Sequence, residues 1–198
     1  MTRIISWNMS HWLRSAEERS AAWDYLRALA PDFVLLQEAV PPDDLGPEHC
    51  VYRPGGMGGH RPWGSAVISF THPISEVVEV TSPHGKHPAQ LHQTYPGSVA
   101  IAACESGLTL ISVYSVIDNG YAITILHRQL SDLTPLFDTK LGRSVVLAGD
   151  LNVTTQFEEP HRSRHRNARE RLQAFSLIDA LDLERPARGP LASVMSLK

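Results

Sequence analysis

Blocks of hydrophobic residues, separated by an amphipathic segment, predict strands that alternate with a helix at the start of the chain. Residues 3–7 and 33–37 are short apolar runs, and they flank residues 15–29, in which apolar side chains recur at helical spacing. Ser15 can cap this helix, and Pro31 ends it. A strand, a helix and a second strand in this order predict a layered α/β unit, with the helix packed on a sheet.

The apolar runs in the middle of the chain predict antiparallel strands. We expect residues 64–70 and 74–80 to pair across a Thr-His-Pro turn. We expect residues 99–103 and 108–113 to form a second hairpin. The stretch from 81 to 96 is rich in His and Pro and is predicted to be a long surface loop.

A second helix is predicted for residues 122–133, with Pro135 limiting its end. It precedes residues 145–152, a stretch that opens with an apolar run led by β-branched valines, which predicts a strand buried on both faces. This strand ends at Asp150 and Asn152. The two side chains either form an Asx-turn that terminates the strand or belong to a functional site at its carboxyl end, where layered α/β proteins place their chemistry.

Length and composition indicate one globular domain over residues 1–198. The chain has 42% hydrophobic and 20% charged residues, which is ordinary for a globular protein. A formal net charge of -3 excludes nucleic-acid binding through overall positive charge, so an anionic substrate would need a local patch or a metal. Cys50 and Cys104 match neither a zinc spacing nor a disulfide framework. Because no signal segment or membrane-spanning window is recognisable, we expect a cytoplasmic protein with no membrane span.

Polar side chains stand where four of the predicted strands end. Asn8 and Glu38 follow the first two strands, Tyr114 follows the second hairpin, and Asp150 and Asn152 follow the last strand. If these strands share a direction, the five side chains meet at one edge of the sheets. Two carboxylates with amides nearby suit a hard cation such as Mg²⁺, which typically takes one or two protein carboxylates together with substrate phosphate. Zinc chemistry fits less well.

Five short motifs make the sequence resemble the endonuclease/exonuclease/phosphatase family of metal-dependent phosphoesterases. They occur in the family's order and are Ser6-Trp7-Asn8, Leu36-Gln37-Glu38, Trp63-Gly64-Ser65-Ala66-Val67, Ser112-Val113-Tyr114-Ser115 and Gly149-Asp150-Leu151-Asn152. Each motif is weak alone, but five in register are a strong signal. The resemblance implies an α/β fold, in which a two-layered β-sandwich is flanked by helices in a four-layer αββα arrangement.

The resemblance also implies a role for each polar residue at the strand ends. Glu38 would ligate Mg²⁺ or Mn²⁺, and Asn8 would support the metal or its waters. Asp150 would orient or deprotonate the attacking water, and Asn152 would hold Asp150 or the phosphoryl group. Tyr114 would hydrogen-bond a phosphate oxygen. The reaction would be in-line attack at phosphorus, with the metal and the donors stabilising charge on the equatorial oxygens.

The C-terminal part of the sequence departs from the family pattern. Family members usually continue with more strands, an Arg/Ser-x-Asp segment and a terminal Ser-Asp-His, and neither segment is present here. Ser10 stands where the family often has an acidic residue, and the family's Asn after Tyr114 has no clean match, although Asp118 and Asn119 lie close by. We therefore expect a C-terminally shortened fold with slower turnover and an exposed sheet edge that can associate with another strand.

Two functions remain open from the sequence. The first is a Mg²⁺-dependent hydrolase of phosphodiester or phosphomonoester bonds, acting on nucleic acid or on a phosphorylated small molecule or lipid. The second is a non-catalytic remnant that binds phosphate-bearing ligands or a partner chain through the open sheet. The basic run over residues 161–171 is interpreted as a solvated face rather than a phosphate contact. Trp12, Trp23 and Trp63 are interpreted as packing aromatics.

Overall fold

The first strand–helix–strand unit forms as the hydrophobic pattern predicts. In the computed structural model, β1 (Ile4–Asn8) and β2 (Phe33–Ala39) are parallel neighbours, and α1 (Ala16–Ala28) connects them. Ser15 and Glu18 form a capping box at the start of α1. Their side chains accept hydrogen bonds from backbone N–H groups that have no partner within the helix. The buried residues of the helix lie on the face packed against the sheet, and they are Ala22, Trp23 and Leu26.

The structure describes residues 2–55, 63–82, 85, 87–116 and 122–152. Within them the strands form two four-stranded sheets and one two-stranded sheet. The first sheet has the order β1-β2-β4-β3. Its other members, β3 (Cys50–Pro54) and β4 (Gly64–Ser69), are antiparallel to each other, and β4 is antiparallel to β2. The first sheet is therefore parallel on the side of β1 and antiparallel on the side of β3.

The second sheet has the order β10-β9-β8-β5. The predicted hairpin is confirmed as β8 (Val99–Cys104) and β9 (Thr109–Tyr114). On one side of the hairpin β10 (Val145–Asp150) runs parallel to β9, and on the other β5 (Ile74–Glu76) runs antiparallel to β8. The parallel pair β9 and β10 brings the carboxyl ends of both strands to the same edge.

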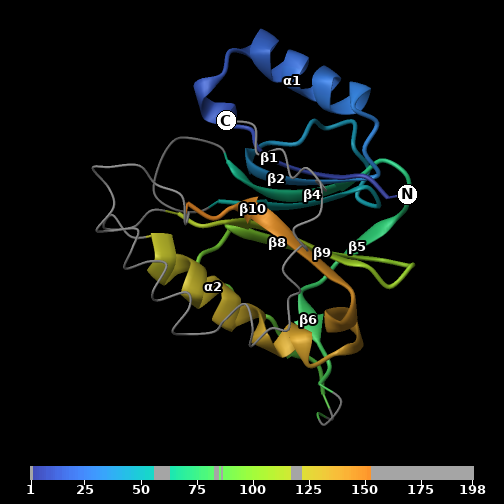
Figure 1. The fold of residues 1–198 in the computed structure, drawn as a ribbon, viewed down its shortest axis with the longest axis vertical. Coiled ribbons are helices and arrows are strands. Elements are labelled where there is room, and N and C mark those ends of the chain that lie inside the picture. Colours follow the sequence, from blue (N-terminus) through green and yellow to red (C-terminus); the bar gives the residue numbers. More distant parts are fainter. Residues whose placement is uncertain (1, 56–62, 83–84, 86, 117–121, 153–198) are drawn as a thin grey trace, which may run out of the picture.

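The two sheets pack face to face between the helices, in the four-layer αββα arrangement that the sequence predicts (Figure 1). One apolar cluster lies between α1 and the first sheet, a second lies between the sheets, and a third lies between the second sheet and α2 (Ala122–Phe137). The 3₁₀ turn η2 (Lys140–Arg143) joins α2 to β10. In the described part of the chain, no helix has the length and apolar character needed to cross a membrane.

The predicted pairing of residues 64–70 with 74–80 is wrong. β4 lies in the first sheet, whereas β5 pairs with β8 in the second, so the chain crosses between the sheets at residues 70–73. Ile74 at the start of β5 is buried in the cluster between the sheets. A short turn can connect strands of two different sheets as well as the two strands of a hairpin. Only the long-range packing of Ile74 distinguishes the two possibilities.

Three smaller expectations also need correction. All residues of β10 are half-buried rather than buried, because this strand has a hydrogen-bonded neighbour on only one side among the described residues. Pro135 lies inside α2 rather than after it, and the burial of Leu136 beyond it offsets the lost backbone hydrogen bond. The stretch 81–96 contains β7 (Ala89–Gln90), which pairs with β6 (Glu79–Val80).

The predictions for residues 153–198 and for Asp118 and Asn119 lie outside the described residues.

A polar contact joins the two sheets within their shared core. Gln37 in β2 donates from Nε2 to the Ser112 hydroxyl of β9 at 2.9 Å and to the Leu35 carbonyl at 3.0 Å. Ser112 in turn donates to the Leu36 carbonyl at 2.7 Å. Gln37 and Ser112 are 1% and 0% exposed, so these bonds form where water cannot replace them.

This contact generates a first prediction. Ser112→Ala should lower the free energy of unfolding by about 1–3 kcal/mol, because it deprives the buried Gln37 amide of a partner. Denaturant unfolding measures the change. Ser75→Ala is the matched control: this exposed serine is 3.5 Å from the Ala103 carbonyl, and its removal should change stability by less than about 0.5 kcal/mol. Equal effects of the two substitutions would contradict the prediction.

Candidate active site

The carboxyl ends of β1 and β10 meet where the two sheets come together. Asn8, the last residue of β1, donates from Nδ2 to Asp150 Oδ2 at 2.8 Å, and Asp150 is the last residue of β10. The two residues are 142 positions apart in the sequence and belong to different sheets. This bond places one carboxylate of the predicted site at the junction of the sheets.

Both Asn8 and Asp150 also form the short turns that end their strands. The Asn8 side-chain oxygen accepts from the Ser10 backbone N–H at 3.0 Å, and Asp150 Oδ1 accepts from the Asn152 backbone N–H at 3.1 Å. Both are Asx-turns, and one interpretation of the sequence expected such a turn at Asp150 and Asn152. Each turn uses one end of the side chain and leaves the other end for the bond between Asn8 and Asp150. The turn and the site therefore coexist.

Ser115 connects the turn after β10 to the end of β9. Its backbone N–H donates to the Asp150 carbonyl at 2.9 Å, and its carbonyl accepts from Asn152 Nδ2 at 2.9 Å. Its hydroxyl donates to the Ala122 carbonyl at the start of α2, also at 2.9 Å. Ser115 is fully buried, so these contacts fix the position of Asn152 relative to β9.

Glu38 reaches the same edge through an irregularity in β2. Between the pairs Leu36–Ala66 and Ala39–Gly64, β2 contains two residues where β4 contains one, which defines a β-bulge. Glu38 is the second bulge residue, and its φ of 46° lies in the left-handed region. The bulge changes the direction of the strand, so that Glu38 lies with the other site residues instead of continuing the alternation of the sheet.

Three contacts surround Glu38 and its neighbour Tyr114. Trp12, in the 3₁₀ turn η1 (His11–Leu13), donates from Nε1 to Glu38 Oε2 at 2.8 Å. The Tyr114 hydroxyl is hydrogen-bonded to the Glu38 carboxylate. The Trp63 ring packs edge-on against the Tyr114 ring, with centroids 5.4 Å apart. Two indoles thus hold the carboxylate and the phenol in place.

The electrostatics of the site are negative. Burial raises the pKa of Tyr114 above its usual value, and the hydrogen bond to Glu38 and the charges of Glu38 and Asp150 raise it further. Among the described residues, neither carboxylate forms an ion pair. Their assigned hydrogen-bond donors are uncharged side-chain or backbone groups. Two neighbouring acids without an ion-pair partner among the described residues make a place where a bound cation would be stabilised.

The donor set of the described residues fits Mg²⁺ or Mn²⁺ better than it fits zinc. No group of three His, Cys, Asp or Glu residues suited to holding a metal occurs in the described part of the chain. Mg²⁺ needs fewer, since one or two carboxylates are enough when water and phosphate complete its shell. Glu38 can supply one carboxylate, because it retains free lone pairs beside the bond that it accepts from Trp12, and the Asn8 side-chain oxygen can supply a second oxygen ligand.

The structure brings together all five residues that the sequence placed at this edge. Asn8, Asp150 and Asn152 are joined by hydrogen bonds, and Tyr114 connects this group to Glu38. The sequence predicts packing roles for Trp12 and Trp63 and gives no separate role to Ser115. Trp12 lies four residues after Asn8, and Trp63 and Ser115 lie within two of the quoted motifs. This closeness to the motifs was the available sequence signal for a place in the site.

The family model for the Endonuclease/Exonuclease/phosphatase family matches residues 5–190, and the chain therefore belongs to this family. No curated protein sequence matches the chain. Solved structures with the same fold include an AP endonuclease from Archaeoglobus fulgidus, with a TM-score of 0.52 and 17% identity. That match covers 97% of this chain and 81% of the endonuclease.

Two further structures share the fold and are longer than this chain. Truncated TDP2 from Caenorhabditis elegans has a TM-score of 0.51 and 14% identity, over 80% of this chain and 66% of that protein. An endonuclease/exonuclease/phosphatase from Beutenbergia cavernae DSM 12333 has a TM-score of 0.52 and 18% identity, over 87% of this chain and 53% of that protein. The chain thus spans between about half and two thirds of their lengths. At these identities the likeness concerns the fold.

The left-handed backbone at Glu38 predicts an unusual order of stabilities. Glu38→Gly should be more stable than Glu38→Ala by about 0.5–1 kcal/mol, because glycine adopts this φ without strain and alanine does not. Denaturant unfolding of both variants measures the difference. At Gln37, whose φ is not left-handed, the order should reverse, with the glycine variant less stable by about 0.5–1 kcal/mol. The same order at both positions would contradict a bulge centred on Glu38.

The raised pKa of Tyr114 predicts that its phenol stays protonated when ordinary tyrosines ionise. At about pH 11, roughly one unit above the usual phenol pKa, the folded protein and Tyr114→Phe should have the same tyrosinate absorbance. In denaturant at the same pH, the variant should have less absorbance, by one tyrosine. Glu38→Gln removes a negative charge and should shift Tyr114 ionisation to lower pH. A tyrosinate deficit in folded Tyr114→Phe would contradict the prediction.

Proposed function

We propose that this protein is a metal-dependent hydrolase of phosphate esters. The observation that carries the proposal is that Glu38 and Asp150, from different sheets, both lie beside Tyr114, and that neither forms an ion pair with a described residue. Membership in the Endonuclease/Exonuclease/phosphatase family supports the same class of chemistry. The substrate class is a phosphodiester or phosphomonoester, in nucleic acid or in a phosphorylated small molecule or lipid.

Asp150 is the residue proposed to act on the attacking water. Its two oxygens accept from Asn8 Nδ2 and from the Asn152 backbone N–H, and these bonds fix the plane of the carboxylate. A carboxylate held in this way can accept a proton from a water placed in line with phosphorus. Asn8 and Asn152 would serve this step by holding Asp150, with the Asn152 side chain anchored on Ser115.

Glu38 is the principal metal ligand proposed for the site, and Asn8 is the second, through its side-chain oxygen or a water. Trp12 occupies one direction of Glu38 Oε2, so the carboxylate is oriented and cannot rotate freely. A divalent cation bound here would neutralise charge on the phosphoryl oxygens. The Tyr114 hydroxyl would donate a hydrogen bond to a phosphate oxygen, which would replace Glu38 as the acceptor. The raised pKa of Tyr114 keeps this hydroxyl protonated and able to donate.

Removal of the metal and of the two carboxylates tests this proposal. The purified chain should hydrolyse bis(p-nitrophenyl) phosphate with Mg²⁺, should lose activity in EDTA and should recover it when Mg²⁺ is restored. Asp150→Asn should reduce kcat by about 10²–10⁴-fold, the usual effect of losing a general base. Glu38→Gln should weaken Mg²⁺ binding measured by calorimetry, because a neutral amide replaces a charged ligand.

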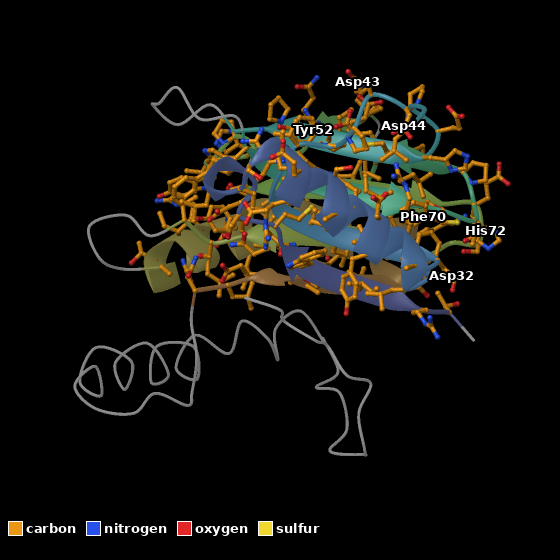
Figure 2. The ribbon with its side chains drawn as sticks, turned by 90° about the horizontal axis from the view of Figure 1, so that it is seen from above. Asp32, Asp43, Asp44, Tyr52, Phe70 and His72 are labelled. Atoms are coloured by element: carbon orange, nitrogen blue, oxygen red, sulfur yellow. The ribbon has the colours of Figure 1, made fainter. Side chains whose placement is uncertain are left out.

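Two exposed carboxylates provide matched controls. Asp43 lies on the outer surface near Asp44 (Figure 2), and Glu79 is exposed in β6. Asp43→Asn and Glu79→Gln should leave both turnover and Mg²⁺ binding unchanged. Turnover that persists in EDTA would refute the metal requirement. Binding of Mg²⁺ and phosphate without any turnover would refute hydrolysis and favour a phosphate-binding protein.

A further inference from the structure

A polar residue occupies a core position on the face of α2 that packs on the second sheet. Leu126, Leu130 and Leu133 form the apolar stripe of this face, and Gln129 lies among them with 1% exposure. Burying an amide costs free energy unless hydrogen bonds replace those it made to water. Gln129 therefore needs hydrogen-bond partners, which the apolar side chains around it cannot provide.

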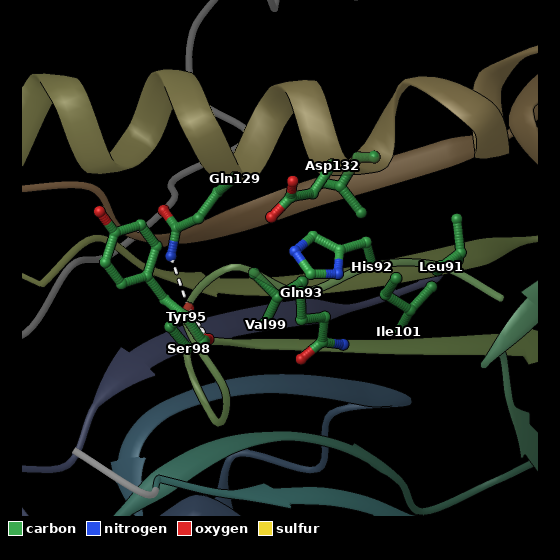
Figure 3. Close-up of a pocket in the computed structure, with 10 residues that line it drawn as sticks. Leu91, His92, Gln93, Tyr95, Ser98, Val99, Ile101, Gln129 and Asp132 are labelled. Carbon is green, nitrogen blue, oxygen red and sulfur yellow. Dashed lines mark hydrogen bonds between the residues drawn. The ribbon is translucent and has the colours of Figure 1, made fainter.

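The Gln129 amide nitrogen binds the end of β9 in two ways. Nε2 donates to the Tyr114 carbonyl at 2.9 Å and to the Ser98 hydroxyl at 2.7 Å. Ser98 is itself held, since its hydroxyl donates to the Tyr95 carbonyl at 2.6 Å (Figure 3). The Ser98 carbonyl accepts from the Tyr114 backbone N–H at 2.7 Å. Gln129 and Ser98 together therefore bind both the N–H and the carbonyl of Tyr114.

Stability alone does not explain why an amide stands at this position. Among the residues that the structure describes, Gln129 Oε1 has no hydrogen-bond partner although it is buried, so half of the amide is desolvated without compensation from them. An apolar side chain like those of Leu126 and Leu130 would avoid this cost. What the amide adds is a fixed position for the backbone of Tyr114. The ring of Tyr114 packs against Trp63, and its hydroxyl lies at Glu38.

We propose that Gln129 is a positioning residue of the site: from the core side of α2 it fixes the backbone of Tyr114, so that the phenol hydroxyl stays at Glu38. This inference rests on the proposed function for its catalytic consequence, but not for its structural part. A displacement of about 1 Å at a residue that contacts substrate can cost up to about 10²-fold in rate, so a lost anchor behind Tyr114 should be visible in turnover.

The test uses Gln129→Met, which keeps the volume of the side chain and removes both hydrogen-bond donors. Leu130→Met is the matched control, since it places the same side chain at the neighbouring buried position of α2. With Gln129→Met, the Tyr114 backbone N–H, which donates to the Ser98 carbonyl, should exchange with deuterium faster by up to about tenfold, the effect of losing one net hydrogen bond. NMR-detected hydrogen exchange of the folded protein measures this rate. Leu130→Met should leave it unchanged.

The kinetic part of the test separates positioning from stability. With bis(p-nitrophenyl) phosphate and Mg²⁺, Gln129→Met should lower kcat by about tenfold or more while KM stays within about threefold, because the hydroxyl is misplaced and the rest of the site is intact. If Gln129→Met fails to fold, Gln129→Asn, which withdraws the amide by one methylene, replaces it in both measurements. A folded variant with the Tyr114 amide exchange rate of the unmodified protein overturns the inference. Absence of turnover in the unmodified protein refutes the proposed function, and the exchange measurement still decides the role of Gln129.

Discussion

The hydrogen bond between Asn8 and Asp150 is the contact on which the rest of the site depends, because it joins the end of a strand in one sheet to the end of a strand in the other. Each sheet alone presents one carboxylate at its carboxyl edge, Glu38 in the first and Asp150 in the second. Only the face-to-face packing of the sheets makes these a pair. Like charges brought together in a partly buried place repel each other, and a divalent cation is the simplest way to stabilise them.

The backbone at this edge is held in conformations that local sequence does not favour. Of the four described non-glycine residues with φ in the left-handed region, Ser10, Glu38 and Asn152 lie at this edge, and Ala30 follows α1. Such conformations cost of order 1–3 kcal/mol each and persist when surrounding contacts determine them. Those contacts are the bulge for Glu38, the bond from Ser115 for Asn152 and the turn on Asn8 for Ser10. The strain is concentrated where side chains must be aimed away from the sheet.

Polar side chains inside the core link this strained edge to the layers behind it. Gln37 and Ser112 connect the two sheets directly beneath the bulge, and Gln129 connects α2 to the last residue of β9. Each of these side chains lies where an apolar residue would bury equally well. Buried amides and hydroxyls require partners in one geometry, whereas apolar contacts tolerate small shifts. The network therefore fixes the relative position of layers that hydrophobic packing alone would leave adjustable.

The sequence by itself determined the elements that depend on neighbouring residues. The periodicity and capping of α1, the apolar strands and the polar residues that end them were all predicted, because each is set by local hydrophobicity and turn chemistry. The tertiary structure alone decided the crossover of β5 to the second sheet, the half-buried position of β10 and the left-handed conformation of Glu38. It also decided that Trp12, Trp63 and Ser115 join the site. These features depend on which strands become neighbours, and that choice is made by packing between residues far apart in the sequence.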